Sequence, residues 1–464
     1  MSANALEVVA LEYCHDTAAR VQNLAALPWF TLLDSCRFAT SGGRYDIAVW
    51  DPVATLTTFG ARTVITDASG SRESSGDPFD LIREHLGDDP QHDFLPFVGG
   101  AVGAFSYDLA RNLEQLPTRA LDDLELPDMA VGIYRQALVV DHEGSSAWFI
   151  HRGLSTDAVH GCVQQLAIPR TMTPATFASD FTVTSPVCPD ISFTEYSNAF
   201  SRIKNYIRDG DCYQVNYAQR FSARAAGNAW DAYQRLRLRN AAPYAAFLRL
   251  PMGDVVCSSP ERFLQVRSGR VETKPIKGTR SRSAEPRLDE ALAAELTSSQ
   301  KDRAENLMIV DLLRNDLGKS CTTGSVSVPK LFELESFARV HHLVSTVTAD
   351  VPHDKHALDI LRDCFPGGSI TGAPKLRAME IIEELEPTRR SIYCGAVGYI
   401  SDDGQMDTNI AIRTLLFTGQ QLHCWAGGGI VADSRLDEEY QESFNKAAAL
   451  LSVFNDAEVP NLGR

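Results

Sequence analysis

The chain has 464 residues, of which 44% are hydrophobic and 22% are charged, and its formal net charge at pH 7 is -16. This is the composition of a soluble globular protein, long enough for one large domain or two to three ordinary ones. The negative charge argues against a nucleic-acid partner, so an anionic substrate must be bound by a local positive pocket. No apolar run approaches the ~18 residues that a membrane helix needs. The first residues also lack the basic start and long apolar core of a signal peptide.

The ten cysteines are scattered singly along the chain, and no two of them form a CxxC pair. A disulfide framework or a zinc cluster would group them. Several lie in apolar, strand-like runs such as "DVVCSS" and "QLHCWAG", where a free cysteine behaves as a small hydrophobic residue. The pattern predicts a protein of a reducing compartment, the cytoplasm.

The first part of the chain, residues 1–165, is rich in short strand-like runs punctuated by glycine, among them "YDIAVW" and "MAVGIYRQALVVDH". Residues 166–191 are rich in Pro, Thr and Ser and show little periodicity, which favours a linker. We therefore predict an N-terminal region over 1–165, a linker over 166–191 and a second region over 192–454.

The second region begins with a helix for which Ser192 and Glu195 form a capping box. Its strands follow one another more often than they alternate with helices, which favours an α+β fold over a doubly wound sheet. Strands are predicted at 213–223, 244–251, 254–259, 261–276, 395–401, 409–417 and 421–431, and further helices at 289–316, 357–363, 373–385 and 436–454.

Two predicted helices carry carboxylates that an ordinary amphipathic pattern does not explain. Glu305 lies on the face of Ile309 and Leu312, and a carboxylate aimed into an apolar layer is costly unless it is paired or binds a metal. A salt bridge to Lys301 or Arg303 is the simpler explanation for Glu305.

The last helix places Glu438, Glu439, Glu442 and Lys446 on neighbouring turns, for which a solvated charged face is the simpler explanation. Two such carboxylates from distant helices would form an oxygen site suited to Mg²⁺.

Two glycine-rich segments are predicted to be turns that bind anions. "FPGGSITGAPK", at 365–375, leads into a helix with Pro374 at its start, and Ala373 stands where a P-loop needs lysine. "AGGGIVADS", at 426–434, follows a strand, and its glycines leave backbone N–H groups unobstructed. Purely structural turns remain an alternative for both. Arg413 interrupts an apolar strand, and its guanidinium suits a carboxylate.

Lys277 lies in "VETKPIKGTRSR", a strand-to-loop corner with Pro275 and Gly278, and Glu261 precedes it by sixteen residues in "SSPERF". A hairpin return would bring the two side chains near each other. Composition alone would place Lys277 on the surface. Together with the carboxylates, the glycine segments and Arg413, the pair indicates an enzyme that acts on a small, multiply anionic molecule.

The motifs "GDCYQVNYAQRF", "SSPERF", "KPIKGTR", "KDRAENLMIVDLLRNDLG", "FPGGSITGAPKLRAMEII", "TNIAIRTL" and "AGGGIVADS", in this order, resemble those of the chorismate-utilising enzymes. The resemblance covers nearly the whole chain, because the N-terminal part resembles the N-terminal region of the anthranilate synthase component I group. It implies an α+β fold with a large, mainly antiparallel β-sandwich surrounded by helices.

Within this family the "PIKGT" position separates the branches. Anthranilate synthases carry alanine where this chain has Lys277. The resemblance is greatest to the lysine-containing branch that converts chorismate to 4-amino-4-deoxychorismate, a transaminase-class step of para-aminobenzoate and folate biosynthesis. Isochorismate and salicylate synthases, in which the lysine activates water, remain an alternative. A non-catalytic regulatory subunit that binds an aromatic amino acid is a second one.

The resemblance implies roles for individual residues. Lys277 would be the nucleophile that adds to C2 of chorismate, with a pKa lowered by burial near cations such as Lys274 and Arg280, and Glu261 would be the general acid/base. His342 would lie beside the ring. The Mg²⁺ ligands would be Glu305 and Glu442, supported by Glu439. The substrate contacts would come from Tyr393, Arg413, Ser369, Gly372, Gly427, Gly428, Gly429 and Lys446.

The family's ammonia comes from a glutamine amidotransferase, and the chain lacks the GxCxG-like motif of such a domain. A separate amidotransferase partner is therefore predicted. Relatives also hold tryptophan near an "LLxS" motif, which Ser35 fits. Gly42 and Gly43 stand where relatives often have bulkier residues, so the resemblance leaves tryptophan binding in this chain an open alternative.

Overall fold

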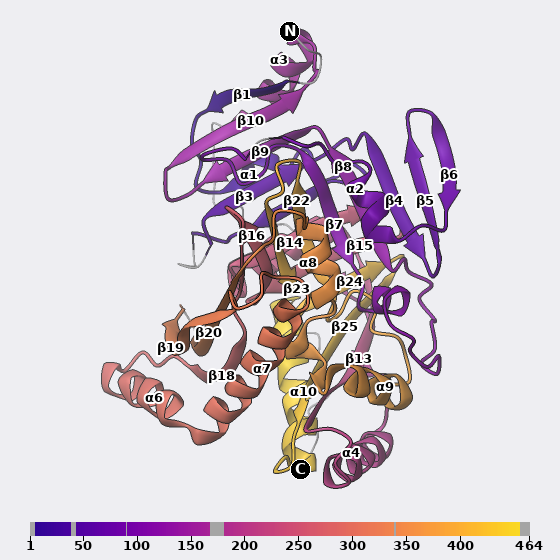
Figure 1. The fold of residues 1–464 in the computed structure, drawn as a ribbon, viewed down its shortest axis with the longest axis vertical. Helices are drawn as coiled ribbons and strands as arrows, with labels where there is room; N and C mark the ends of the chain where they lie inside the picture. Colours follow the sequence, from indigo (N-terminus) through magenta and orange to yellow (C-terminus); the bar gives the residue numbers. More distant parts are fainter. Residues whose placement is uncertain (1–4, 39–42, 90, 168–180, 338–339, 455–464) are drawn as a thin grey trace.

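The computed structural model describes residues 5–38, 43–89, 91–167, 181–337 and 340–454. Two large antiparallel sheets face each other in it, and helices cover them on the outside (Figure 1). The predicted α+β fold with a mainly antiparallel β-sandwich is therefore confirmed. Within the described ranges, no helix has both the length and the apolar character that crossing a bilayer requires.

The first sheet has thirteen strands, and the order along it is β1-β10-β9-β3-β2-β14-β15-β24-β25-β13-β11, with β12 and β21 also paired to β13. Its strands are β1 (Leu6–Leu11), β2 (Thr31–Asp34), β3 (Tyr45–Val49), β9 (Gln136–Asp141), β10 (Ser146–Arg152), β11 (Thr182–Val183), β12 (Cys188–Pro189), β13 (Gln214–Ala226), β14 (Tyr244–Leu250), β15 (Gly253–Ser259), β21 (Gly372–Ala373), β24 (Thr414–Thr418) and β25 (Gln421–Ile430).

The second sheet has twelve strands in the order β18-β20-β17-β16-β23-β22-β7-β8-β4-β5-β6, with β19 paired to β20. Its strands are β4 (Ala54–Phe59), β5 (Arg62–Asp67), β6 (Gly70–Ser74), β7 (Gly100–Phe105), β8 (Met129–Tyr134), β16 (Arg262–Arg267), β17 (Arg270–Thr273), β18 (Ile276–Ser281), β19 (Ser327–Ser336), β20 (Val340–Asp350), β22 (Ala396–Ser401) and β23 (Met406–Ile410).

The helices are α1 (Thr17–Val21), α2 (Pro78–Arg83), α3 (Thr156–Gln165), α4 (Phe193–Arg208), α5 (Ala229–Arg239), α6 (Pro286–Ser298), α7 (Gln300–Gly318), α8 (Ala357–Cys364), α9 (Lys375–Leu385) and α10 (Leu436–Leu451), with short 3-10 helices η1 (Tyr107–Asn112), η2 (Gly368–Ile370) and η3 (Ser452–Phe454). The capping box of Ser192 and Glu195 is present at the start of α4.

The core lies in two main layers. Leu248 and Val255 of the first sheet pack with Leu264 and Val397 of the second, so that this layer fills the space between the sheets. On its other face the first sheet packs against helices α4, α5, α9 and α10. Strand β14 is buried along most of its length because it is covered on both faces.

Strands from the predicted N-terminal region and from the second region share both sheets. β2 pairs with β14 in the first sheet, and β7 pairs with β22 in the second. The predicted linker lies partly outside the described residues, since 168–180 are not among them. The boundaries at 165 and 191 therefore stay predictions about the sequence.

Two predicted elements are divided in the structure. The helix predicted over 289–316 is two helices, α6 and α7, because Ser299 has an extended conformation and its side chain caps α7 at Asp302 N. The strand predicted over 409–417 is interrupted between β23 and β24, where Arg413 has a φ of 50°. In both places the boundary is set by the conformation of a single residue.

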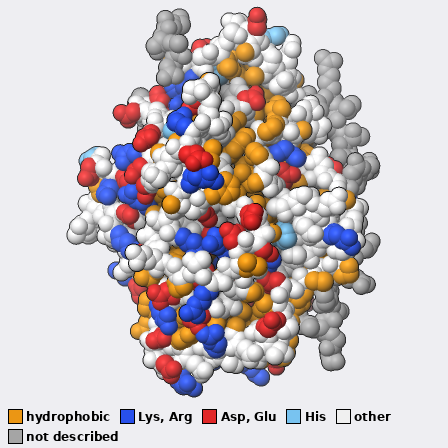
Figure 2. All heavy atoms as spheres, turned by 90° about the vertical axis from the view of Figure 1, so that its right-hand side faces the viewer, with side chains coloured by type: hydrophobic (Ala, Val, Ile, Leu, Met, Phe, Trp, Pro, Cys, Tyr) orange, Lys and Arg blue, Asp and Glu red, His pale blue; other side chains and the backbone are white. Residues whose placement is uncertain are grey.

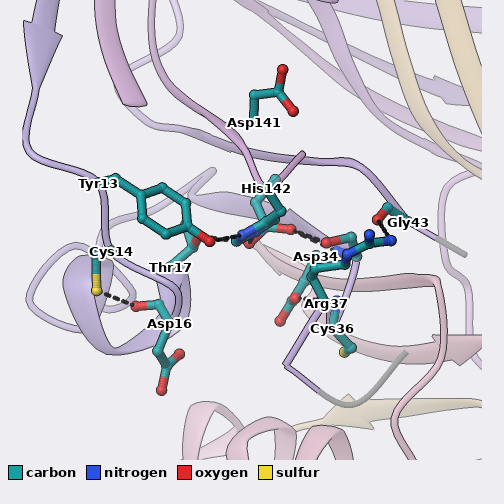
Figure 3. Close-up of polar contacts among 12 residues, drawn as sticks. Tyr13, Cys14, Asp16, Thr17, Asp34, Cys36, Arg37, Gly43, Asp141 and His142 are labelled. Carbon is teal, nitrogen blue, oxygen red and sulfur yellow. Dashed lines mark hydrogen bonds and ion pairs between the residues drawn. The ribbon is translucent and has the colours of Figure 1, made fainter. Parts of the chain in front are cut away.

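A buried polar network joins α1 to strands β2, β3 and β9 (Figure 3). Asp46 accepts hydrogen bonds from Thr17 Oγ1 at 2.6 Å and from the backbone N and Oγ of Ser35 at 2.8 and 2.6 Å. His142 Nε2 lies 2.7 Å from Asp46 Oδ2, and the hydroxyl of Tyr13 lies 2.9 Å from His142 Nδ1. Burial alone lowers the pKa of His142, but the hydrogen bond and charge of Asp46 outweigh it and raise that pKa.

Replacing His142 with asparagine should destabilise the fold by about 3 kcal/mol, because it leaves the buried Asp46 carboxylate without its cation. The effect should depend on pH. Since the pKa of His142 is raised in the folded state, its stabilisation is complete below the unfolded value of about 6.5 and is lost as pH rises through the folded value. Urea unfolding of wild type and variant across this range measures the difference, which should narrow at alkaline pH.

The matched control is His160→Asn, because His160 is exposed on α3. Its unfolding free energy should follow the wild-type pH curve. A constant difference between wild type and the His142 variant at every pH would mean that the Asp46–His142 pair does not carry the charge assigned to it.

Candidate active site

Lys277 lies on β18 at an irregularity that turns the strand. The pairing of β18 with β20 shifts register between Ile276 and Thr279, and Gly278 has a φ of 87°. A Cβ at Gly278 would come within 2.9 Å of Asp302 Cβ and of Leu296 Cδ1, so only glycine allows α6 and α7 to approach this closely. A bulge of this kind re-aims side chains, and here Lys277 lies against the Ser369 turn.

Lys277 and Glu261 form the centre of the site. The Nζ of Lys277 donates a hydrogen bond to the carbonyl oxygen of Ser369 at 3.1 Å. Glu261 is 6% exposed at the entrance to β16. Burial raises the pKa of Glu261, and the charge of Lys277 and a hydrogen bond to Ser369 oppose that rise. One turn therefore contacts both predicted catalytic side chains.

Burial also lowers the pKa of Lys277. The negative charges of nearby carboxylates oppose this shift, and the positive charge of Lys446 contributes to it. The prediction that Lys274 and Arg280 supply this effect is wrong. Lys274 forms an ion pair with Glu335 at 2.6 Å, and Arg280 is bound by Glu295 and Asp302. Both cations are thereby neutralised by carboxylates of their own.

The predicted metal carboxylates come from α7 and α10, which lie in the lower half of Figure 1. Burial raises the pKa of Glu305, and the charge of Glu439 raises it further. Burial likewise raises the pKa of Glu439, and the charge of Glu442 raises it further. Carboxylates that raise one another's pKa suit a divalent cation. No group of three His, Cys, Asp or Glu side chains within the described residues is arranged to hold a metal by itself. Mg²⁺ fits this arrangement, because it typically binds one or two carboxylates together with water and an anionic ligand.

The glycines of "AGGGIVADS" do not form the predicted turn. Gly427, Gly428 and Gly429 lie inside β25, where they pair with Ala218, Tyr217 and Asn216 of β13. Gly428 faces the carboxylates of α10: a Cβ there would lie 3.0 Å from Glu439 Oε2 and 3.6 Å from Glu442 Oε1. The strand therefore approaches the carboxylates through its bare backbone.

Lys446 joins this strand to α10. Its Nζ lies 2.6 Å from Glu442 Oε1 and donates to the carbonyl oxygen of Gly427 at 2.8 Å. Both Lys446 and Glu442 are about half exposed, so this side of the site opens to solvent.

Arg413 lies close enough to His342 for its charge to lower the pKa of that residue, and His342 pairs with Thr279 of β18. Arg413 is partly buried, burial lowers the pKa of its guanidinium, and no described residue forms a hydrogen bond or ion pair with that group. A partly buried guanidinium in this state suits a carboxylate ligand. Burial, and then the charge of Arg413, lower the pKa of His342 to about 4, so His342 is neutral at neutral pH. Its Nδ1 lies 2.9 Å from Thr279 Oγ1.

Tyr393 is buried and stacks on Trp425 at 6.3 Å between ring centroids. Gly372 has a φ of 148°, and a Cβ there would lie 2.1 Å from the carbonyl oxygen of Gln214. Gly372 is therefore required by the close approach of β21 to β13, and its predicted contact with substrate stays a prediction.

On one face of the molecule the charged side chains do not form a continuous acidic surface (Figure 2). On the face seen in Figure 2, Lys and Arg side chains are interspersed with Asp and Glu, and hydrophobic side chains gather in a band between them. Local charges, rather than the net charge of -16, therefore decide which ions the site attracts.

The chain belongs to the family of chorismate binding enzymes, whose family model matches residues 33–452. Two relatives are each named aminodeoxychorismate synthase component 1. The one from Klebsiella aerogenes is 50% identical over 432 residues, which cover 92% of this chain and 94% of that protein. The one from Escherichia coli K12 is 47% identical over 433 residues, with coverages of 92% and 94%.

Among solved structures, anthranilate synthase component I from Streptococcus pneumoniae TIGR4 superposes with a TM-score of 0.79 and is 34% identical, covering 88% of this chain and 92% of that one. The family resemblance inferred from the motifs is thus confirmed. So is the greater similarity to aminodeoxychorismate synthase component 1, at 50% identity, than to this anthranilate synthase, at 34%.

Proposed function

We propose that the protein converts chorismate and ammonia to 4-amino-4-deoxychorismate, and that a separate glutamine amidotransferase subunit supplies the ammonia. The observation that carries the proposal is that the turn at Ser369 contacts both the partly buried Lys277 and the buried Glu261. The similarity to proteins named aminodeoxychorismate synthase component 1 supports the same reaction and, through the word component, a partner. The ten free cysteines support a reducing, cytoplasmic setting.

In this proposal the reaction proceeds in two substitutions. The neutral amine of Lys277 bonds to C2 of the ring while the C4–O bond breaks, and Glu261 gives its proton to the hydroxyl, which leaves as water. Ammonia then bonds to C4 while the C2–N bond breaks, and the electron pair returns to Lys277. The lowered pKa of Lys277 favours the neutral amine, and the raised pKa of Glu261 favours the protonated acid.

The remaining residues would bind and orient the substrate. Arg413 would bind a carboxylate of chorismate, with Tyr393 beside the enolpyruvyl group and neutral His342 beside the ring. The segment Gly427–Gly429, Ser369, Gly372 and Lys446 would form the walls. Glu305 and Glu442, supported by Glu439, would hold Mg²⁺. When bound, this ion would neutralise the ring carboxylate and stabilise developing negative charge.

The test is a product assay on the purified protein with chorismate, Mg²⁺ and ammonium, with products separated by chromatography and identified by mass. The expected product is 4-amino-4-deoxychorismate, and glutamine should replace ammonium only when an amidotransferase is added. Isochorismate formed without regard to ammonium would assign the protein to the water-activating branch. If the protein consumes no chorismate, a non-catalytic regulatory subunit would be the remaining explanation.

Replacing Glu305 with glutamine should raise the Mg²⁺ concentration that gives half-maximal activity by about 10- to 100-fold, because a carboxylate ligand is lost. Chelation of Mg²⁺ should abolish the activity of the wild type. The matched control is Glu438→Gln, since Glu438 is exposed on α10 and pairs with Arg435 at 3.4 Å. An unchanged Mg²⁺ requirement in the Glu305 variant would remove this residue from the metal site.

We also propose that tryptophan binds in a cavity of about 250 Å³ that lies between the two sheets. Ser35 lines it, together with Tyr244 and Arg267. Gly43 is required beside it, because a Cβ there would lie 2.2 Å from Ser35 Cβ, whereas Gly42 lies outside the described residues. Calorimetric titration with tryptophan should give saturable binding that Ser35→Leu abolishes, and the absence of binding by wild type would disprove this proposal.

A further inference from the structure

Arg390 is the most deeply buried arginine near the site, at 1% exposure, and neither the motifs nor the proposed mechanism gives it a role. It follows α9, one turn beyond Glu386. In sequence, the Arg389–Arg390 pair after Pro387 is typical of a solvated helix end. In the structure the two arginines differ, since Arg389 forms an ion pair with the surface residue Asp122 at 2.7 Å.

The guanidinium of Arg390 makes four hydrogen bonds in directions that a planar fork allows. Two go to the carboxylate of Glu386, at 2.8 and 2.6 Å. One goes to the carbonyl oxygen of Asn216 on β13, at 2.5 Å, and one goes from Nη1 to the carbonyl oxygen of Ile370, at 3.0 Å. The last of these bonds holds the carbonyl group of Ile370, the residue that directly follows Ser369.

The turn that carries Ser369 is thus bound on one side to β13 and α9. The side chain of Asn216 donates through Nδ2 to the same Ile370 carbonyl oxygen at 2.9 Å. The backbone N of Asn216 donates to the carbonyl oxygen of Thr371 at 2.8 Å. Glu386, which holds Arg390, accepts a further bond from the backbone N of Ala218 at 2.9 Å. Since Ser369 contacts both Lys277 and Glu261, a displacement of this turn would separate the two catalytic side chains.

We propose that Arg390 is a positioning residue for the reaction, whose bond to the Ile370 carbonyl fixes the turn on which Lys277 and Glu261 meet. It acts through Ser369 and does not touch the substrate. This inference rests on the proposed roles of Lys277 and Glu261.

The same geometry predicts how the variant behaves. In Arg390→Lys the positive charge opposite Glu386 remains, but a single ammonium cannot reach all three acceptor groups. The Ser369 carbonyl, which stabilises the protonated form of Lys277, would move away, and this loss would lower the pKa of Lys277 further. A misplaced nucleophile reacts more slowly even when substrate still binds.

The experiment measures the protonation of Lys277 and the kinetics on the same proteins. Intact protein is labelled briefly with acetic anhydride, which reacts with neutral amines, over the interval from about pH 6 to about pH 11 that brackets a lowered lysine pKa. The Lys277 peptide is then quantified by mass spectrometry. In Arg390→Lys the labelling midpoint should fall by about half a pH unit or more, and kcat should fall about tenfold or more with little change in KM for chorismate.

Two further variants separate positioning from a general loss of stability. Arg237→Lys is the matched control, because Arg237 is a 2%-exposed arginine bound to Asp34 at 2.7 Å and to Asp16 at 3.0 Å. It should lose stability but keep the wild-type midpoint. Asn216→Ala removes the other donor to the Ile370 carbonyl without leaving a buried charge, and it should shift the midpoint in the same direction by less.

If Arg390→Lys does not fold, Asn216→Ala decides the question alone. Folded variants with the wild-type midpoint and kcat would overturn the inference, and so would an equal shift in Arg237→Lys. The labelling does not require turnover. A wild type that makes no 4-amino-4-deoxychorismate would therefore disprove the proposed function while the midpoints still report on the role of Arg390.

Discussion

Replacing Lys277 with alanine should reduce the formation of 4-amino-4-deoxychorismate by about a thousandfold or more, as the loss of a nucleophile does in other covalent enzymes. The expectation rests on the position of the amine, which is partly buried, close to Glu261 and bonded to the Ser369 carbonyl at 3.1 Å. Steady-state rates with chorismate and ammonium measure the effect. The wild type should also give a protein adduct of chorismate, detectable by mass after rapid acid quenching, and the variant should not.

Lys274→Ala is the matched control for this prediction. Lys274 lies three residues away in the same segment, but its ammonium pairs with Glu335 at 2.6 Å and does not lower the pKa of Lys277. The control should keep near-wild-type kcat. A Lys277 variant that retains most of the activity would exclude the covalent route and leave direct attack of ammonia on the ring.

Replacing Glu261 with glutamine should lower kcat by about 10²- to 10⁴-fold, which is the usual contribution of a general acid. The pH dependence distinguishes this role from a structural one. Burial raises the pKa of Glu261, so the acid form persists to higher pH than in an ordinary glutamate, and the rate should fall as pH rises through that value. The residual rate of the variant should not show this fall at alkaline pH (the alkaline limb of the pH profile), because glutamine does not titrate.

Glu272→Gln provides the comparison for Glu261. Glu272 lies on the neighbouring strand β17, is one-third exposed, and pairs with Arg262 at 2.8 Å. Its replacement should change neither kcat nor the pH profile. If the Glu261 variant keeps the alkaline limb of the wild type, the titrating group belongs to another residue, and Glu261 is not the acid.

Local sequence signals predicted most of the elements around the site. The capping box at Ser192 marks the start of α4, and Pro374 marks the start of α9, because caps and proline act on the residues next to them. The sequence did not reveal that Ser299 divides the helix 289–316. It also did not reveal that Arg413 leaves the strand, since a positive φ in an arginine has no local signature.

The glycines 427–429 illustrate a different limit of prediction from the sequence. Three consecutive glycines are typical of a turn, yet they lie in β25 because β13 supplies a partner for each of them. Of the three, Gly428 faces Glu439 and Glu442, two residues of α10, which comes later in the chain. Local propensity yields to tertiary pairing at such a position.

The sequence by itself determined the kinds of groups that the site contains, namely a lysine, several carboxylates, an inward arginine and bare glycine backbone, and their collinear motifs determined the family. Only the tertiary structure decided how these groups affect one another. Lys277 and Ser369 are separated by 92 residues, and Arg390 reaches a carbonyl 20 residues earlier in the chain. The protonation of such groups depends on burial and on charges supplied by distant elements. These quantities exist only once the sheets and helices have packed together.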